Sequence, residues 1–360
     1  MKDLGYEIGY KKSKIIKKLY LELTDRCNLN CAFCYRKSWD KCFQDMSQKV
    51  YEKLMKDIKE IEGIERIVLG GIGEPTCFVG FERVLEDLKD YKLHITTNGT
   101  LLTDALIEKI VDTVSYITIS VDGVEDYFEA IRGISLDRVV DGINRLQAAK
   151  KRRRSSTPEL QLQFVSSKTN IDSLFQVIDL AKELDCYQLI ISSLIPQIDE
   201  NKDKILYTKE GSNKLMKDLW NRARNYAFRK GITIYLPNIQ LKTERGCSFI
   251  DDVTTYISAE GDAIPCYRLS HDYDEYVFGR RKRVTKHSFG NIMDSSILEI
   301  WNSKEYQQYR YVVHNNLYPS CMDCDLVEGC EFPKETLEDC FGCLPSCSDC
   351  LWGRKFVMCP

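Results

Sequence analysis

Short β-rich runs alternate with amphipathic stretches from about residue 18 onward, and this alternation restricts the fold more than any other feature of the chain. The runs expected to form strands are residues 18–24, 66–71, 93–98, 116–122, 160–167 and 187–194. The stretches between them with apolar residues three and four positions apart are residues 47–63, 81–91, 101–113, 137–151 and 173–185. Such spacing is typical of helices buried on one face, and strands that alternate with helices predict a parallel sheet with crossover helices.

Six βα units are fewer than the eight that close a full barrel. The expected fold class is therefore α/β, with a partial (β/α)6 TIM-like barrel whose open side leaves room for a large substrate. A long helix and one further strand are expected within residues 212–237, after which the alternation weakens. Because ten of the sixteen cysteines lie at or beyond Cys247, we expect the barrel at residues 1–240 and a small cysteine-rich α+β domain at residues 241–360.

Composition excludes several classes of protein. With 360 residues, 43% of them hydrophobic, the chain can bury one large core and a smaller module. Its net charge of −3 argues against a nucleic-acid partner. The first residues lack the apolar core of a signal peptide, and no stretch approaches the ~20 apolar residues of a membrane span, so we expect a cytoplasmic protein with no membrane partner. Sixteen cysteines in that reducing compartment predict metal binding rather than disulfides.

Three cysteines, Cys27, Cys31 and Cys34, share the stretch "TDRCNLNCAFCYRKSW" with the spacing C-x3-C-x2-C. A zinc site usually takes four ligands and a disulfide takes two, whereas three thiolates suit an iron–sulfur cubane with one iron left open. The stretch begins where the first expected strand ends, which is where active sites of parallel βα folds gather. A zinc site completed by a distant fourth ligand is the alternative, although the chain has only four histidines.

Glycine-rich or polar motifs follow the next three expected strands: "GGIGEPT" at 70–76, "TTNGT" at 96–100 and "SVDG" at 120–123. Glycines let the backbone approach a ligand closely, and the carboxylate of Glu74 can pair with an ammonium group. Each motif taken alone can be a simple turn. Four such segments at four successive strand ends predict a single ligand that lies across the mouth of the barrel.

These motifs resemble those of radical S-adenosylmethionine (SAM) enzymes over residues 18–195, including "IRGISLDRVVDGINRL" at 131–146. The resemblance implies that the three cysteines hold a [4Fe-4S] cluster whose open iron chelates SAM. Reductive cleavage would give a 5'-deoxyadenosyl radical that abstracts hydrogen from a substrate. By the same resemblance, Gly71, Gly73 and Glu74 would meet the SAM ammonium. The other candidate cofactor-binding residues, of which the last three would lie near the ribose or carboxylate, are Tyr35, Asn98, Ser120 and Asp122.

The C-terminal region resembles the SPASM extension of radical SAM maturases, which binds auxiliary iron–sulfur clusters through C-x(9 to 15)-G-x4-C and C-x2-C-x5-C. The matching cysteines are Cys247, Cys266, Cys321, Cys324 and Cys330. Where the family expects a further cysteine this chain has Lys334. The remaining candidate ligands are Cys340, Cys343, Cys347, Cys350 and Cys359. Two cubanes need eight thiolates, so three [4Fe-4S] clusters are expected in total, with the partition of the auxiliary ligands open. A zinc ribbon built on C-x2-C pairs is the alternative.

One residue, at position 267, narrows the range of expected reactions. Sulfatase maturases of this architecture have an aspartate that acts as a base after the cysteine equivalent to Cys266, whereas this chain has Tyr267. Formylglycine formation is therefore not expected, and Tyr267 is either a phenol relay or a packed aromatic. Two segments, "CYRKSW" and "PSCSDCLWGRKFVMCP", resemble maturases associated with tungsten-pterin aldehyde oxidoreductases.

The leading hypothesis is an enzyme that acts on a peptide or protein, with ferredoxin or flavodoxin as its reducing partner. A non-catalytic iron–sulfur carrier or scaffold is the alternative, but such a protein needs no open iron. Of the other cysteines, Cys42 and Cys186 are expected in the core, while Cys77 beside "GGIGEPT" is a candidate hydrogen-atom donor. The basic stretch 279–287 is expected to be a solvated loop, and recognition of an acidic peptide or protein partner is the alternative.

Overall fold

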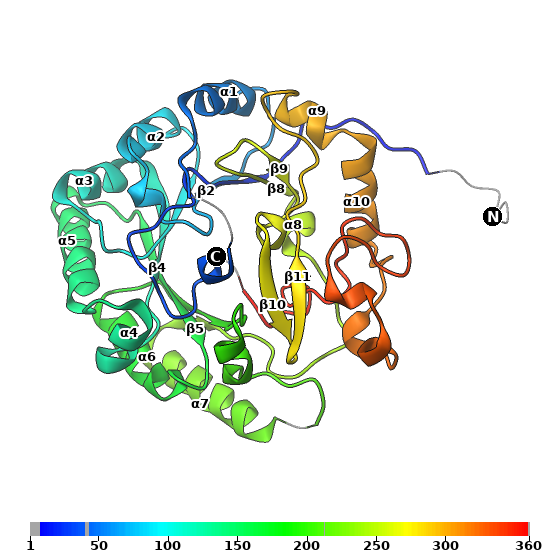
Figure 1. Cartoon of the computed structure of the whole chain (residues 1–360). Coiled ribbons are helices and arrows are strands. Elements are labelled where there is room, and N and C mark those ends of the chain that lie inside the picture. The colour runs from blue at the N-terminus through cyan, green and yellow to red at the C-terminus, as the bar shows by residue number, and fades with distance from the viewer. Residues whose placement is uncertain (1–7, 40–42, 212, 359–360) are drawn as a thin grey trace.

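The computed structural model describes residues 8–39, 43–211 and 213–358. Its main sheet resembles an open barrel seen end-on in Figure 1, with the strands inside an arc of helices. The strands of this sheet are β1 (Lys18–Leu21), β2 (Arg66–Leu69), β3 (Leu93–Thr97), β4 (Val114–Ser120), β5 (Glu159–Ser166), β6 (Gln188–Ser193), β7 (Thr233–Tyr235), β8 (Thr254–Ile257) and β9 (Ala263–Ile264).

The sheet has the order β7-β6-β5-β4-β3-β2-β1-β8-β9. Strands β1 to β7 pair with their sequence neighbours in parallel, which confirms the expected α/β barrel with its six strands and the further one. Strand β8 was not expected in the barrel, but it pairs in parallel with β1, and β9 pairs antiparallel with β8. Because β7 and β9 are the two edges of the sheet, the barrel does not close. The boundary near residue 240 remains a prediction, since the sheet continues past it.

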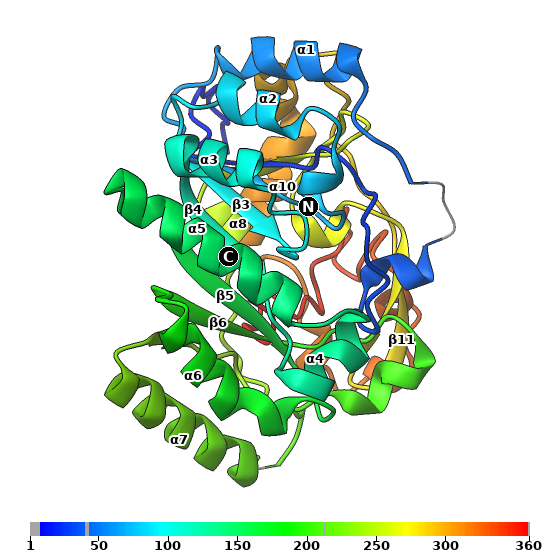
Figure 2. The same cartoon turned by 90° about the vertical axis from the view of Figure 1, so that its left-hand side faces the viewer.

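Helices cover the outer face of this sheet, as Figure 2 shows from the side. Their bounds are α1 (Gln48–Ile58), α2 (Phe81–Asp87), α3 (Asp104–Thr113), α4 (Glu125–Arg132), α5 (Asp137–Arg153), α6 (Leu174–Glu183) and α7 (Lys214–Lys230). Polar side chains fix two of their first turns: Ser47 accepts a hydrogen bond from the Val50 amide and Thr103 accepts one from the Leu106 amide, as N-cap residues do. All five expected helices of the βα units form, and α4 is an additional short one.

The barrel core lies between the sheet and the helices. Strand residues such as Leu19, Ile67 and Leu69 are completely buried against helical residues such as Ile110 and Ile143. Parallel strands that are buried on both faces are rich in apolar residues, and β1 and β2 follow this pattern. Strands β3, β4 and β5 also carry buried polar side chains, among them His94, Thr118 and Gln161.

The C-terminal region covers the open side of the barrel, on the right of Figure 1. Its elements are α8 (Ser248–Asp251), the antiparallel hairpin β10 (Tyr273–Val277) and β11 (Arg280–Val284), α9 (Ile297–Trp301) and α10 (Lys304–His314), followed by short 3-10 turns. The expectation of a solvated loop at 279–287 is wrong, because the fully buried Lys282 of β11 forms an ion pair with Asp349 at 2.8 Å. None of the helices in the described ranges is long and apolar enough to span a bilayer.

Candidate functional site

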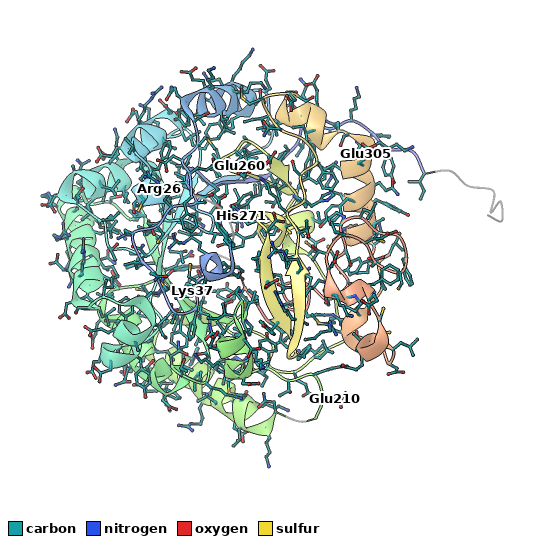
Figure 3. All side chains as sticks on the ribbon, in the orientation of Figure 1. Arg26, Lys37, Glu210, Glu260, His271 and Glu305 are labelled. Carbon is teal, nitrogen blue, oxygen red and sulfur yellow. The ribbon has the colours of Figure 1, made fainter. Side chains whose placement is uncertain are left out.

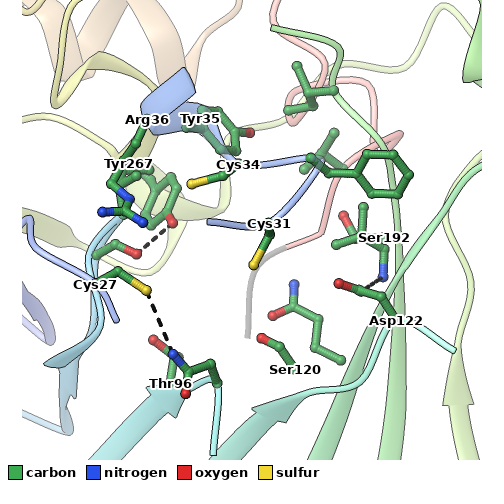
Figure 4. A pocket seen from close by; sticks show the side chains of 18 of the residues that line it. Cys27, Cys31, Cys34, Tyr35, Arg36, Thr96, Ser120, Asp122, Ser192 and Tyr267 are labelled. Carbon is green, nitrogen blue, oxygen red and sulfur yellow. Dashed lines mark hydrogen bonds between the residues drawn. The ribbon is translucent and has the colours of Figure 1, made fainter. Parts of the chain in front are cut away.

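A cavity of about 240 Å3 opens at the carboxyl ends of the barrel strands. Most of the candidate residues of the barrel line it: Cys27, Cys31, Cys34, Tyr35, Gly71, Gly73, Glu74, Asn98, Ser120 and Asp122. Figure 4 shows the three sulfur atoms directed into this space, with Ser120 and Asp122 on one side and Tyr267 on the other. Motifs separated by almost a hundred residues therefore surround one space, as a single ligand would require.

Local hydrogen bonds hold the cysteine loop over the strand ends. The Ala32 amide donates to the Ile131 carbonyl at 2.8 Å, and Asn201 Nδ2 donates to the Ala32 carbonyl at 3.1 Å. Cys34 directly precedes the 3-10 turn Tyr35–Ser38. The Leu29 amide donates to Cys27 Sγ at 3.4 Å. The loop is thus tied to α4 and to the segment after β6, and its thiols face inward.

The environment of these thiols fits an iron–sulfur cluster. Burial raises the pKa of Cys27 to about 11 and also raises the pKa of Cys31. Such thiols stay protonated at neutral pH unless a cation compensates the charge of the thiolate, and coordination to a metal deprotonates a thiol outright. Three inward-facing thiols that need compensating positive charge suit the three-cysteine ligation of a cubane. The residues present therefore fit the cluster that the sequence predicts.

Two guanidinium groups lie beside these thiols. Arg132 Nη1 is 3.7 Å from Cys31 Sγ, and its Nη2 is 2.5 Å from a carboxylate oxygen of Asp122. Burial opposes the charge of Arg132, but Asp122 and Cys31 outweigh it and raise its pKa. The pKa of Arg36 is raised as well, since Cys34, Cys27 and Cys31 outweigh its burial. Arg132 was not among the residues predicted for the site, although it lies in segment 131–146, twelve residues after "SVDG" begins.

Glu74 joins two strand ends and, among the residues that the structure describes, retains one free acceptor site. Its Oε1 accepts hydrogen bonds from the Thr76 amide, the Thr76 hydroxyl and the Thr97 hydroxyl, at 3.2, 2.6 and 2.6 Å. Its Oε2 accepts one from the Asn98 amide at 2.7 Å. A carboxylate offers about four acceptor sites, two on each oxygen, so a second donor can still bind Oε2. Burial raises the pKa of Glu74 more than these hydrogen bonds lower it, so a cationic donor there would stabilise the ionised form.

The remaining barrel candidates have identifiable contacts. Asn98 Nδ2 donates to Asn28 Oδ1 at 2.9 Å and lies 3.7 Å from Cys27 Sγ, which links β3 to the cysteine loop. The Val165 amide donates to Asp122 at 2.8 Å. Cys77 is not among the residues that line the cavity, and its sulfur lies 3.7 Å from Asn28 Oδ1. Its proposed part in hydrogen transfer remains a prediction.

Tyr267 reaches the cavity from the C-terminal region. Its hydroxyl donates to the Gly71 carbonyl at 2.7 Å, and its ring packs edge-on against Tyr35 with centroids 6.3 Å apart. It is therefore both packed and hydrogen-bonded. Trp352, Val357 and Met358 also line the cavity, so the side of the barrel that we expected to be open to a large substrate is covered by the C-terminal region.

A second cavity lies behind Tyr267 and Trp352, which line both spaces. The cysteines that surround it are Cys247, Cys266, Cys347 and Cys350. Burial raises the pKa of Cys347 to about 12, and the Tyr309 hydroxyl lies 3.3 Å from its sulfur. Four half-buried thiols around one space match the ligand set of a cubane. Sequence spacing could not reveal this set, because it joins the two ends of the cysteine-rich region.

The other described cysteines of this region are Cys321, Cys324, Cys330, Cys340 and Cys343. Burial raises the pKa of Cys321, and the charge of Cys340 contributes to that rise. Lys334 is exposed and forms an ion pair with Glu331 at 2.6 Å. Cys42 and Cys359 lie outside the described residues, and Cys186 is buried in the core as expected. Within the described ranges, no three histidine, cysteine or acidic side chains form a group that could hold a single metal ion. The thiols surround wider spaces, as the ligands of a cluster of several irons do.

Comparison with protein families gives two matches. A model described as the radical SAM superfamily matches residues 21–160, and SPASM, described as an iron-sulfur cluster-binding domain, matches residues 247–325. The tungsten-containing aldehyde ferredoxin oxidoreductase cofactor-modifying protein of Pyrococcus furiosus is 35% identical over 356 residues, covering 96% of this chain and 97% of that protein. A probable GTP 3',8-cyclase of Sulfurisphaera tokodaii is 31% identical over 188 residues, covering 50% of this chain and 57% of its own.

Solved structures have the same fold. Streptococcus suis SuiB bound to its precursor peptide SuiA superimposes with a TM-score of 0.63 at 14% identity, covering 94% of this chain and 77% of that one. Native anSMEcpe with bound AdoMet gives a TM-score of 0.58 at 17% identity, covering 94% and 95%. At these identities the similarity concerns the architecture of the barrel and its C-terminal extension.

Proposed function

Because this chain belongs to the radical SAM superfamily and carries a SPASM iron–sulfur domain, we propose that it is a maturase that cleaves SAM reductively and abstracts hydrogen from a peptide or protein substrate. The cluster would be held by Cys27, Cys31 and Cys34. The observation that carries the proposal is the convergence of these thiols with acidic and basic side chains around one cavity at the strand ends. A carrier of electrons needs the thiolates alone, whereas a SAM site also needs groups for an ammonium and a carboxylate.

Different side chains of the cavity would bind the ammonium group and the carboxylate group of SAM. The free acceptor site on Glu74 Oε2 suits the ammonium group, with the backbone of Gly71 and Gly73 beside it. The guanidinium of Arg132 suits the carboxylate, because its fork can hold two oxygens at once. Ser120 presents a hydroxyl group for the ribose, whereas Asn98 would reach the ribose by exchanging its hydrogen bonds to Asn28 and Thr100. In this arrangement Asp122 orients Arg132 through their ion pair.

When bound, the cluster and SAM together supply the radical chemistry, and the protein's part is to orient the substrate and exclude water. Tyr267, Trp352 and Val357 close the cavity on the C-terminal side. An apolar and aromatic wall of this kind keeps solvent away from a reactive species. Tyr267 remains a candidate relay, because its hydroxyl faces the same cavity.

We assign the first auxiliary cluster to the four thiols of the second cavity, Cys247, Cys266, Cys347 and Cys350. The second auxiliary cluster would use Cys321, Cys324, Cys330 and Cys340. We take Cys340 rather than Cys343 as the fourth ligand because the Cys343 thiol is directed to the Leu317 carbonyl, 3.8 Å from its sulfur. Together with the SAM cluster this makes three [4Fe-4S] clusters, reduced by ferredoxin or flavodoxin.

The proposed reaction is a step in the maturation of a tungsten-containing oxidoreductase. This part of the proposal follows the full-length similarity to the Pyrococcus furiosus protein, whose name states that it modifies a cofactor. A second candidate function is modification of the oxidoreductase's cofactor rather than of its polypeptide. The name of the Pyrococcus furiosus protein favours this second candidate.

The experiment uses a tungsten-containing oxidoreductase purified from cells that lack this protein. We would incubate it anaerobically with reduced protein and SAM, then measure 5'-deoxyadenosine and the masses of the polypeptide and of the extracted cofactor. A mass change in the polypeptide supports the first candidate, and a change in the cofactor alone supports the second. If neither mass changes while SAM is cleaved, the link to this oxidoreductase is wrong.

A further inference from the structure

The peptide bond between Gly71 and Ile72 is held on both of its polar groups. The Gly71 carbonyl accepts a hydrogen bond from the Tyr267 hydroxyl at 2.7 Å. The Ile72 amide, which belongs to the same peptide plane, donates to Glu22 Oε1 at 3.0 Å. This plane lies in the middle of "GGIGEPT", and both residues line the cavity. Its orientation is therefore set by two side chains from outside the motif.

Glu22 is itself held by the C-terminal region. His271 Nε2 lies 2.9 and 3.1 Å from the two carboxylate oxygens of Glu22. Both side chains are buried, Glu22 completely, and the His271 ring packs against Trp39 with centroids 4.0 Å apart. Burial disfavours the charge of Glu22, but His271 and the Ile72 amide outweigh it and lower its pKa. His271, labelled in Figure 3, lies two residues before the hairpin of the C-terminal region.

Position 71 has no room for a side chain larger than that of glycine. Its φ of +149° is one that other residues rarely adopt. A Cβ at this position would lie 2.6 Å from Glu22 Oε1 and 2.7 Å from Glu22 Cγ. Glu22 therefore packs directly on the backbone of Gly71. The fit between the end of β1 and the motif after β2 leaves the peptide plane little freedom to rotate.

We infer that Tyr267, together with His271 acting through Glu22, forms a clamp by which the C-terminal iron–sulfur region fixes the SAM-binding loop of the barrel. The inference rests on the proposed function. These three are positioning residues: they hold the backbone that carries Gly71, Gly73 and Glu74 at the angle that SAM needs. Because Tyr267 directly follows Cys266, the clamp also connects the SAM site to the first auxiliary cluster.

The clamp predicts that Tyr267 and Glu22 affect SAM binding through the same peptide plane. Tyr267→Phe removes one oxygen and keeps the ring, and we expect it to weaken SAM binding about three- to tenfold, as the loss of one hydrogen bond does. Glu22→Gln keeps an acceptor for the Ile72 amide but loses the charge that binds His271, and we expect a similar loss. In the double variant the two losses should be less than multiplicative, because residues that act on one element are coupled.

The experiment measures SAM affinity from the change that SAM causes in the electron paramagnetic resonance spectrum of the reduced SAM cluster, with iron content and thermal unfolding measured on the same samples. Tyr273→Phe is the matched control, since that buried hydroxyl has no hydrogen-bond partner in the described part of the chain. Its affinity should equal that of the wild type.

The outcomes separate the inference from the function on which it rests. A wild type that shows no spectral response to SAM would contradict the proposed function itself. A normal response in the wild type, with unchanged affinity in Tyr267→Phe and Glu22→Gln, would overturn the clamp alone. Two losses that multiply independently would also overturn it, because Tyr267 and Glu22 would then not share one element.

Discussion

Arg132 and the buried Asp122 form an ion pair at the edge of the cavity at the strand ends, with Nη2 2.5 Å from the carboxylate and Nη1 3.7 Å from Cys31 Sγ. The same guanidinium thus contacts an acidic side chain and a candidate cluster ligand. It is the last residue of α4, so the negative end of the helix dipole also favours its charge. In the proposed function, this cation would lie beside the cluster and bind the carboxylate of SAM.

Arg132→Lys tests this role. Lysine keeps the positive charge but cannot form the planar fork that binds two oxygens. We expect SAM affinity to fall about tenfold while iron content stays the same, measured by titration with SAM and by iron assay. Arg132→Leu should in addition destabilise the protein by about 3–5 kcal/mol, because it leaves Asp122 as an unpaired buried charge. Unchanged SAM affinity in the lysine variant would contradict the assignment.

Glu74→Gln tests the ammonium site. The amide keeps the size of the side chain and loses the charge, and we expect SAM binding to weaken by about 1.5–3 kcal/mol, or roughly ten- to a hundredfold. Since four hydrogen bonds reach Glu74, the variant should also unfold at a lower temperature. Comparing affinity at a temperature where both proteins are folded separates the two effects. An unaltered affinity there would make "GGIGEPT" an ordinary turn.

Cys340→Ala and Cys343→Ala form a matched pair. If Cys340 is the fourth ligand of the second auxiliary cluster, its removal should lower iron content by up to about four atoms per chain. Cys343→Ala should retain all the iron. Iron and sulfide assays on anaerobically reconstituted protein measure the difference. The reverse result would exchange the two cysteines, and loss in neither variant would show that another group completes the cluster.

His94 makes the stability of the barrel depend on pH. This histidine of β3 is buried and lies 2.8 Å from the Thr118 hydroxyl; burial, then the charges of Arg66 and Lys18, lower its pKa from 6.5 to about 3. Protons therefore bind the unfolded chain first, and stability is lost as the pH falls below 6.5. At pH 5.5 this loss amounts to about 1.4 kcal/mol relative to pH 8.

His94→Gln should remove that part of the pH dependence while it keeps a polar partner for Thr118. Urea midpoints at pH 8 and pH 5.5 measure it. We expect the wild type to lose more stability than the variant between the two conditions. Parallel changes in both proteins would show that His94 is protonated in the folded state.

Most of the barrel could be predicted because the sequence patterns that specify its strands and motifs are local. Each β-rich run and each cysteine or glycine motif lies in one short stretch, and the carboxyl ends of parallel strands must meet at one edge. The convergence of Cys27, Glu74, Asn98 and Asp122 followed from that rule. Helix α4 was missed because its eight residues offer only two turns of apolar spacing.

The contacts of the C-terminal region could not be predicted in this way. Tyr267 contacts Gly71, 196 residues away in the sequence, and His271 contacts Glu22, 249 residues away. Hydrophobic periodicity cannot predict such pairs. The pairing of β8 with β1 is equally non-local. The charges of the stretch 279–287 predict a solvated loop, whereas Asp349 compensates the charge of Lys282 inside the protein.

The most direct measurement of the central claim compares the wild type with a variant in which Cys27, Cys31 and Cys34 are all alanine. After anaerobic reconstitution and reduction with dithionite, the wild type should contain about twelve irons and form 5'-deoxyadenosine from SAM. The variant should retain about eight irons in its auxiliary clusters and form none. Formation of 5'-deoxyadenosine by that variant would contradict the assignment of the SAM cluster to these three cysteines.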